Sequence, residues 1–108
     1  MAGEVAEGLT IEPIWVVESA YAPDATERRA PVRAEHLARI GELRKAGTIL
    51  EAGAFTDMSG SLILLRAASE AQARAIVQAD VYYRSGVWTG CHIRPLGRVA
   101  RQDEIPTR

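Results

Sequence analysis

Short apolar runs, separated by polar or glycine-containing breaks, set the pattern of this chain. The β-branched and aromatic run Ile-Trp-Val-Val predicts a strand over about 12–20. Two further strands are expected over 48–55 and 61–67, joined as a hairpin by the turn sequence Asp-Met-Ser-Gly. A last strand is expected over 87–96, ending near Pro95, because proline cannot donate to a strand ladder.

Between the first two strands, apolar residues recur at helical spacing. Leu37, Ile40 and Leu43 follow one another at intervals that place them on one face of a helix over 31–46. Gly47 is the expected end of this helix, because glycine readily adopts the left-handed conformation of a C-terminal cap.

A second, alanine-rich helix is expected from Ser69 to about Ala79. Ser69 and Gln72 have the spacing of a capping box at its start. The polar stretch 24–30 and the stretch 80–86 are expected to be irregular connections.

The resulting order, β-α-β-β-α-β, is the ferredoxin-like pattern of an α+β fold with a four-stranded antiparallel sheet. The strands carry apolar residues on both faces, since Ile14 and Val16 alternate with Trp15 and Val17. Two helices cover only one face of such a sheet. We therefore expect the other face to pair sheet to sheet with a second copy of the chain, forming a homodimer. The alternative is a monomer whose open face is shielded by the N-terminal arm.

The 108 residues are enough for one domain only. We expect a flexible N-terminal arm over 1–11, the folded domain over 12–98 and a polar C-terminal tail over 99–108. Hydrophobic residues make up 47% and charged residues 25%, which is typical of a soluble globular protein and excludes a disordered chain.

Charge and cysteine content narrow the function classes. Thirteen Lys and Arg residues face fourteen Asp and Glu residues, so no nucleic acid partner is expected. No apolar run is long enough to span a membrane, and residues 1–10 lack the pattern of a signal peptide. The single cysteine, Cys91, cannot form a disulfide within the chain and fits a reducing cytoplasm.

Two ionisable residues occupy positions that face inward. His36 precedes Ile40 by one helical turn and lies on or beside the apolar stripe of the first helix, and Asp80 extends the buried stripe of the second. Paired with each other, the carboxylate would orient the imidazole, whose other nitrogen could move a substrate proton. The alternative is that His36 bonds to backbone and Asp80 caps a turn.

Other side chains are candidates for substrate binding. Arg33 lies one turn before His36 and could bind a carboxylate or phosphate, or be a surface cation. Ser61 follows the hairpin turn and could present its hydroxyl to a ligand or close the turn. Tyr82 and Trp88 could line an apolar pocket or pack in the core. No metal-ligand spacing and no glycine-rich phosphate loop are present, so neither a metal nor another cofactor is expected.

Short motifs in a fixed order resemble the YciI-like family over about residues 12–97. They are Tyr-Ala-Pro-Asp at 21–24, Arg-Ala-Glu-His-Leu at 33–37, Ala-Gly at 46–47, Ala-Gly-Ala at 52–54, Gly-Ser-Leu at 60–62, Asp-Val-Tyr at 80–82 and Gly-Val at 86–87. The resemblance implies a ferredoxin-like dimeric α/β-barrel protein, related to muconolactone isomerase, with a conserved His and Asp at a pocket. His36 and Asp80 match those two positions. The family usually has proline after this aspartate, whereas this chain has Val81, which constrains the backbone less.

Two classes of function follow from these observations. The first is a cofactor-independent enzyme in which His36 and Asp80 transfer a proton during elimination, dehydrochlorination or isomerisation of a small aromatic or otherwise conjugated molecule. Arg33, Ser61 and Tyr82 would bind that substrate. The second is a non-catalytic module that binds a small ligand or regulates a partner. A monooxygenase of the same superfold rests on fold analogy alone.

Overall fold

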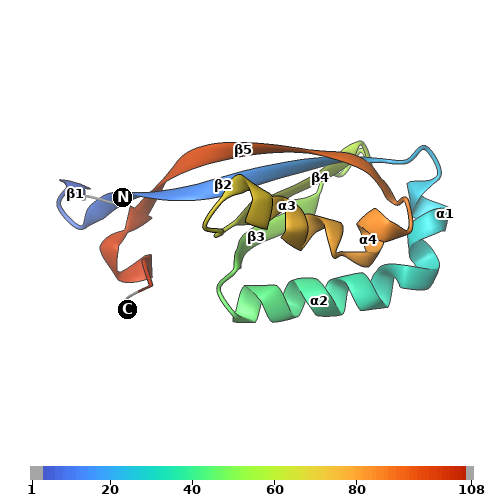
Figure 1. Ribbon diagram of the computed structural model, residues 1–108, viewed down its shortest axis with the longest axis horizontal. Helices are drawn as coiled ribbons and strands as arrows, with labels where there is room; N and C mark the ends of the chain where they lie inside the picture. Colours follow the sequence, from blue (N-terminus) through green and yellow to red (C-terminus); the bar gives the residue numbers. More distant parts are fainter. Residues whose placement is uncertain (1–3, 107–108) are drawn as a thin grey trace.

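The computed structural model describes residues 4–106 as an antiparallel sheet with helices on one face (Figure 1). The strands are β1 (Glu4–Ala6), β2 (Leu9–Tyr21), β3 (Ile49–Ala54), β4 (Gly60–Leu65) and β5 (Trp88–Arg101). The helices are α1 (Ala25–Arg29), α2 (Arg33–Lys45), α3 (Glu70–Gln78) and α4 (Val81–Arg84), with 3₁₀ turns η1 (Ala30–Val32) and η2 (Gln102–Glu104).

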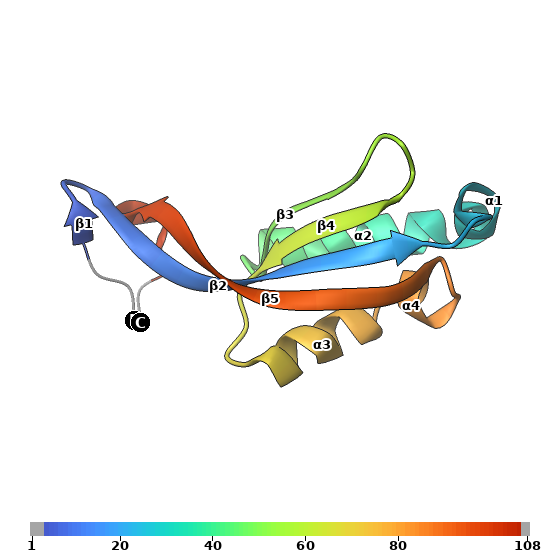
Figure 2. The same cartoon turned by 90° about the horizontal axis from the view of Figure 1, so that it is seen from above.

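The sheet has the order β3-β4-β2-β5, and all its pairs are antiparallel. The short strand β1 adds a fifth member by pairing with the start of β2. Figure 2 views the sheet from the side away from the helices and shows no helix in front of it. The α+β ferredoxin-like order is therefore confirmed, with five strands instead of the expected four.

The hydrophobic core lies between the sheet and the helices. Val17 and Leu65 of the central strands are completely buried, and Val77 of α3 is 2% exposed. Because alternate strand residues point to opposite faces, Val16 and Leu64 lie on the face away from this core. Each buried aliphatic side chain contributes about 1.5–3 kcal/mol to the free energy of folding.

Local sequence explains where the helices begin and end. At the end of α2, Gly47 has φ of 81° and donates to the carbonyl of Arg44, while Thr48 donates to the carbonyl of Leu43. These two bonds form a Schellman cap, as the glycine predicted. At the start of α3, the Ser69 hydroxyl accepts from the amide of Gln72.

Most described residues of the expected N-terminal arm belong to strands, since residues 4–6 form β1. Leu9 to Ile11 belong to β2, and they pair with residues 99–101 of β5. Residues 1–3 lie outside the described residues. The stretch 24–30, expected to be an irregular loop, contains helix α1 and enters η1, so the helical region begins earlier than predicted.

Two further expectations fail in the C-terminal half. The stretch 80–86 contains the helical turn α4 instead of an irregular connection. Strand β5 continues past Pro95 to Arg101, whereas the sequence predicted an end near Pro95. Within the described residues β5 pairs only with β2, and proline is tolerated on such an edge strand.

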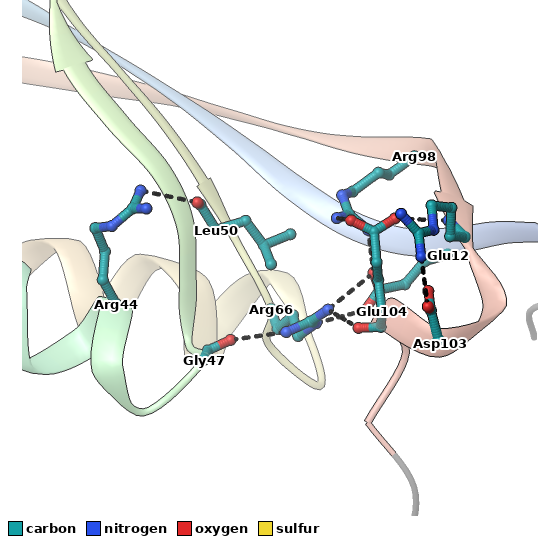
Figure 3. A network of polar contacts seen from close by, with 9 residues as sticks. Glu12, Arg44, Gly47, Leu50, Arg66, Arg98, Asp103 and Glu104 are labelled. Carbon is teal, nitrogen blue, oxygen red and sulfur yellow. Dashed lines mark hydrogen bonds and ion pairs between the residues drawn. The ribbon is translucent and has the colours of Figure 1, made fainter.

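A charged network joins the long β2–β5 ribbon to the rest of the fold (Figure 3). The Glu12 carboxylate, whose side chain is 8% exposed, accepts from Arg66 and Arg98. Arg66 also donates to the backbone carbonyls of Gly47 and Glu104. The start of β2, the end of α2 and the C-terminal turn are thereby tied together around one buried carboxylate.

Candidate functional site

His36 lies in the first turn of α2 and is the buried residue of that helix, with 8% of its surface exposed. Its position above the sheet follows from the stripe it shares with Ile40 and Leu43, which pack against the core. The helix therefore turns an ionisable ring toward the interior, as the sequence predicted.

Asp80 is the N-cap of α4, and it is 1% exposed. Its Oδ1 lies 2.7 Å from Nδ1 of His36 and accepts from the amide of Tyr82 at 2.9 Å. Its Oδ2 accepts from Arg39 at 3.2 Å. Both sequence interpretations of Asp80 thus hold together, because the carboxylate caps a turn and also bonds the imidazole.

The charge state of Asp80 follows from these contacts. Burial raises the pKa of its carboxyl group, but the hydrogen bonds from His36 and Tyr82 and the positive charge of Arg39 outweigh burial. The net result is a pKa below the ordinary value, so Asp80 is ionised at neutral pH. An ionised acceptor favours the His36 tautomer that carries its proton on Nδ1.

Two aromatic rings fix the plane of the imidazole. The Tyr82 ring stacks on His36 with centroids 3.6 Å apart and planes 7° from parallel. Trp88 meets the imidazole edge to face, with centroids 5.5 Å apart. Together with the bond to Asp80, these contacts hold the ring in one orientation, and Nε2 bonds to no described residue.

The imidazole borders a cavity of about 140 Å³ between α2 and the sheet. Three of the predicted binding residues also line it: Arg33 at the start of α2, Ser61 on β4 and Tyr82 on α4. Asp80 does not line the cavity and lies behind His36. Burial raises the pKa of Tyr82 above its usual 10, so its hydroxyl is protonated at neutral pH and can donate a hydrogen bond.

Two arginines of this region were missed by the sequence analysis. Arg39 donates both to Asp80 and to the carbonyl of Ile76, and Arg29 lines the cavity. Arg39 lies three residues after His36 on α2, a spacing that indicates neighbouring side chains. Arg29 lies in the stretch 24–30, for which the sequence predicts an irregular connection, so no helical spacing links it to Arg33.

The other chemically active side chains lie apart from the cavity. The exposed His92 is on β5 opposite Glu18, and Cys91 is a free thiol near Arg74. Across the described part of the chain, His, Cys, Asp and Glu side chains form no group of three that could hold a metal ion. None of the helices between residues 4 and 106 is long and apolar enough to cross a membrane.

The fold and the site define a ferredoxin-like α+β domain with a buried histidine–aspartate pair beside a small cavity. Comparison with known proteins shows to which family this domain belongs. The model of the YCII-related domain matches residues 14–97, so the chain belongs to that family, which confirms the resemblance found in the sequence.

Named relatives and a solved structure agree with this assignment. Protein YciI of Escherichia coli O6:H1 and Protein YciI of Shigella flexneri are each 28% identical to the chain over 96 residues, covering 80% of it and 98% of the relative. The chain also matches 5-chloro-2-hydroxyhydroquinone dehydrochlorinase (TftG) from Burkholderia phenoliruptrix AC1100, solved in complex with 2,5-dihydroxybenzoquinone. That match has a TM-score of 0.66 at 20% identity and covers 75% of this chain and 90% of TftG.

Proposed function

We propose that the protein is a cofactor-independent enzyme that transfers a proton between His36 and a small aromatic or otherwise conjugated molecule. The observation that carries this proposal is the 2.7 Å contact between Nδ1 of His36 and the ionised Asp80, at a ring that borders a cavity. A histidine oriented by a carboxylate is a common general base, because the second nitrogen can then accept a proton.

The roles of the residues follow from their positions. His36 takes a proton from the substrate through Nε2, and Asp80 orients the ring and stabilises its positive charge. The proton then returns to another atom of the substrate in an isomerisation, or a leaving group such as chloride departs in an elimination. Arg33, Ser61 and Tyr82 bind the substrate. Each of these reactions is acid–base chemistry, which needs neither a metal nor a redox cofactor.

The fold relative TftG supports this choice of reaction, since it is named as a dehydrochlorinase and was solved with a quinone ligand. The alternative class, a non-catalytic ligand-binding or regulatory module, would use the same cavity without turnover. The two classes differ in whether a bound molecule exchanges a proton with His36, which is measurable before the natural substrate is known.

The test is deuterium exchange in D₂O, followed by proton NMR on a panel of small phenols, hydroxyquinones and keto acids. We expect the protein to catalyse exchange at carbon for at least one compound, and His36→Asn to lower the rate by about 10²–10⁴-fold. His92→Asn, which changes the other histidine of the chain, is the matched control and keeps the full rate. Thermal unfolding confirms that each variant is folded.

Two results would contradict the enzymatic proposal. One is full exchange in His36→Asn, which would assign the chemistry elsewhere. The other is binding of a panel compound in the cavity with no exchange above the rate in buffer, which would favour the binding module.

We further propose that two copies pair through the open face of the sheet. Val16, Leu62 and Leu64 lie on that face, and each is only half-buried within one chain. A sheet with apolar residues on both faces gains stability when both faces are covered. Sedimentation equilibrium is expected to give twice the mass of the chain, and Leu64→Glu to give the monomer mass; a monomer at all concentrations would contradict this proposal.

We also propose a cytoplasmic location, since the single free thiol of Cys91 suits a reducing compartment. Subcellular fractionation, followed by detection of the native protein in each fraction, tests this proposal directly.

A further inference from the structure

The polar residues that line the cavity are basic or neutral, and none is acidic. Arg29 and Arg33 line it together with His36, and none of its lining residues is an Asp or a Glu. Asp80, the nearest acid to the imidazole, lies behind the ring and is occupied by three donors. The cavity thus offers positive charge and hydrogen-bond donors.

The two arginines are also distinctive in their lack of acidic partners. Every other arginine between residues 4 and 106 forms an ion pair, as Arg28 does with Asp24 and Arg39 with Asp80. Within the same range, neither Arg29 nor Arg33 forms one. Their guanidinium groups are therefore not neutralised by the protein itself.

Their charges act inside the site as well as at its edge. The positive charges of Arg29 and Arg33 both lower the pKa of Tyr82, against the larger effect of burial. Arg29 and Arg33 line the same cavity as Tyr82, so their charges act on the phenol that stacks on His36.

Two neutral donors at the cavity lack partners. The hydroxyl of Ser61 and Nε1 of Trp88 are buried without a hydrogen bond to any described residue, and both side chains line the cavity. Ser61 is 5% and Trp88 3% exposed. A buried donor without a partner lowers stability. Neither atom has appreciable accessible surface, so these two residues line the cavity with their other atoms.

We propose that the substrate of this site is a small anion whose ionised oxygen group is bound by Arg29 and Arg33. Arg33 is exposed, so the ionised group lies toward solvent. This inference rests on the proposed function and adds the charge that the substrate must carry.

The size of the cavity limits the rest of the molecule. Its volume of about 140 Å³ is close to that of an engineered cavity of about 150 Å³ that holds benzene. One six-membered ring or an equally short chain fits within this volume, whereas a nucleotide or a fused-ring compound would extend out of it into solvent. The substrate class is therefore a single-ring or shorter carboxylate, phenolate or enolate.

Binding of four probes tests the charge requirement without turnover. Benzoate and 4-nitrophenolate carry an ionised oxygen, while benzamide and benzyl alcohol have similar size without charge. We expect titrations followed by amide NMR shifts to give at least about tenfold tighter binding for one anion than for either neutral probe. The tighter anion identifies a carboxylate or a phenolate as the preferred group, and its affinity falls as salt is raised to about 0.3 M.

Matched variants assign the effect to the two arginines. Arg29→Gln and Arg33→Gln each weaken binding of the preferred anion by about three- to tenfold, and the double variant abolishes the preference for anions. Lys45→Gln, which removes the same charge from the far end of α2, leaves binding unchanged. The inference is overturned if neither anion binds, if benzamide binds as tightly, or if Lys45→Gln has the same effect as the arginine variants.

The result is separable from the test of the proposed function. His36→Asn is expected to keep the preference for anions while deuterium exchange is lost. If the wild-type protein prefers anions but catalyses no exchange, the enzymatic proposal is contradicted and the anion inference stands. If it catalyses exchange without preferring anions, the anion inference is contradicted and the enzymatic proposal stands.

Discussion

Replacing Asp80 by asparagine perturbs the contact at the centre of the site with little change of shape. Asparagine can turn its carbonyl oxygen toward His36 and the amide of Tyr82, which keeps those two hydrogen bonds in neutral form. Its NH₂ group then faces the Arg39 guanidinium, which is also a donor. The hydrogen bond of 3.2 Å from Arg39 to the carboxylate is therefore lost. The variant therefore loses the charge and one bond but keeps the turn.

The expected loss of stability follows from these contacts. Hydrogen bonds to a charged group contribute about 1.5–3 kcal/mol, against about 0.5–1.5 kcal/mol for neutral ones. Weakening the bond to His36 and losing the bond to Arg39 therefore amounts to about 2–4 kcal/mol. The lower part of this range is favoured because the Arg39 side chain is 30% exposed and can turn to water.

Urea unfolding at pH 7, with all variants at one protein concentration, measures this loss. Asp57→Asn is the matched control, because the exposed Asp57 makes only a local bond to the amide of Ser59 and asparagine can keep it. We expect no measurable change for the control. A loss below about 0.5 kcal/mol for Asp80→Asn would show that the carboxylate is not held by His36 and Arg39.

Three further predictions concern charge and packing. Because the pKa of Asp80 is lowered in the folded protein, its contribution is complete above the unfolded value near 4 and is lost as pH falls through the folded value. The difference in unfolding free energy between wild type and Asp80→Asn is thus expected to be constant from about pH 6 to 5 and to shrink below about pH 4; widening there would refute the sign. Leu65→Ala, at a fully buried position, is expected to lower the unfolding free energy by about 2–5 kcal/mol, and Leu96→Ala, at a site 41% exposed, by clearly less. Glu12→Gln is expected to cost about 1–2 kcal/mol and to speed amide hydrogen exchange at residues 98–101, whereas unchanged exchange would show that the network around Arg66 does not hold the ribbon.

Much of the fold was accessible from local sequence patterns. The apolar runs and the glycine cap gave the alternation of strands and helices, since each reflects the chemistry of a few neighbouring residues. The length of the β2–β5 ribbon was not accessible in this way. Leu9 pairs with Arg101, which lies far from it in the chain, and no local sequence pattern predicts such a pairing.

Some residues of the site could likewise be predicted from local sequence, and others could not. His36 and Asp80 could be singled out because each is a polar residue on an apolar stripe, which needs a partner. The resemblance to the YciI-like family, more than the stripe, favoured their pairing. Arg39 and Arg29 could not be singled out, because a long arginine on a helix usually lies in solvent, and only the folded structure shows what its guanidinium group reaches. The unpaired state of Arg29 and Arg33 depends on the positions of every acidic side chain nearby.

The proposed proton transfer depends on the orientation of the His36 imidazole ring, which NMR of the protein labelled with ¹⁵N-histidine reports directly. We expect the neutral His36 ring to carry its proton on Nδ1, bonded to Asp80, and to present an unprotonated Nε2 whose resonance shifts when benzoate enters the cavity. A proton on Nε2 at the same pH, or an Nε2 resonance indifferent to every bound probe, would contradict the proposed role of His36 in proton transfer.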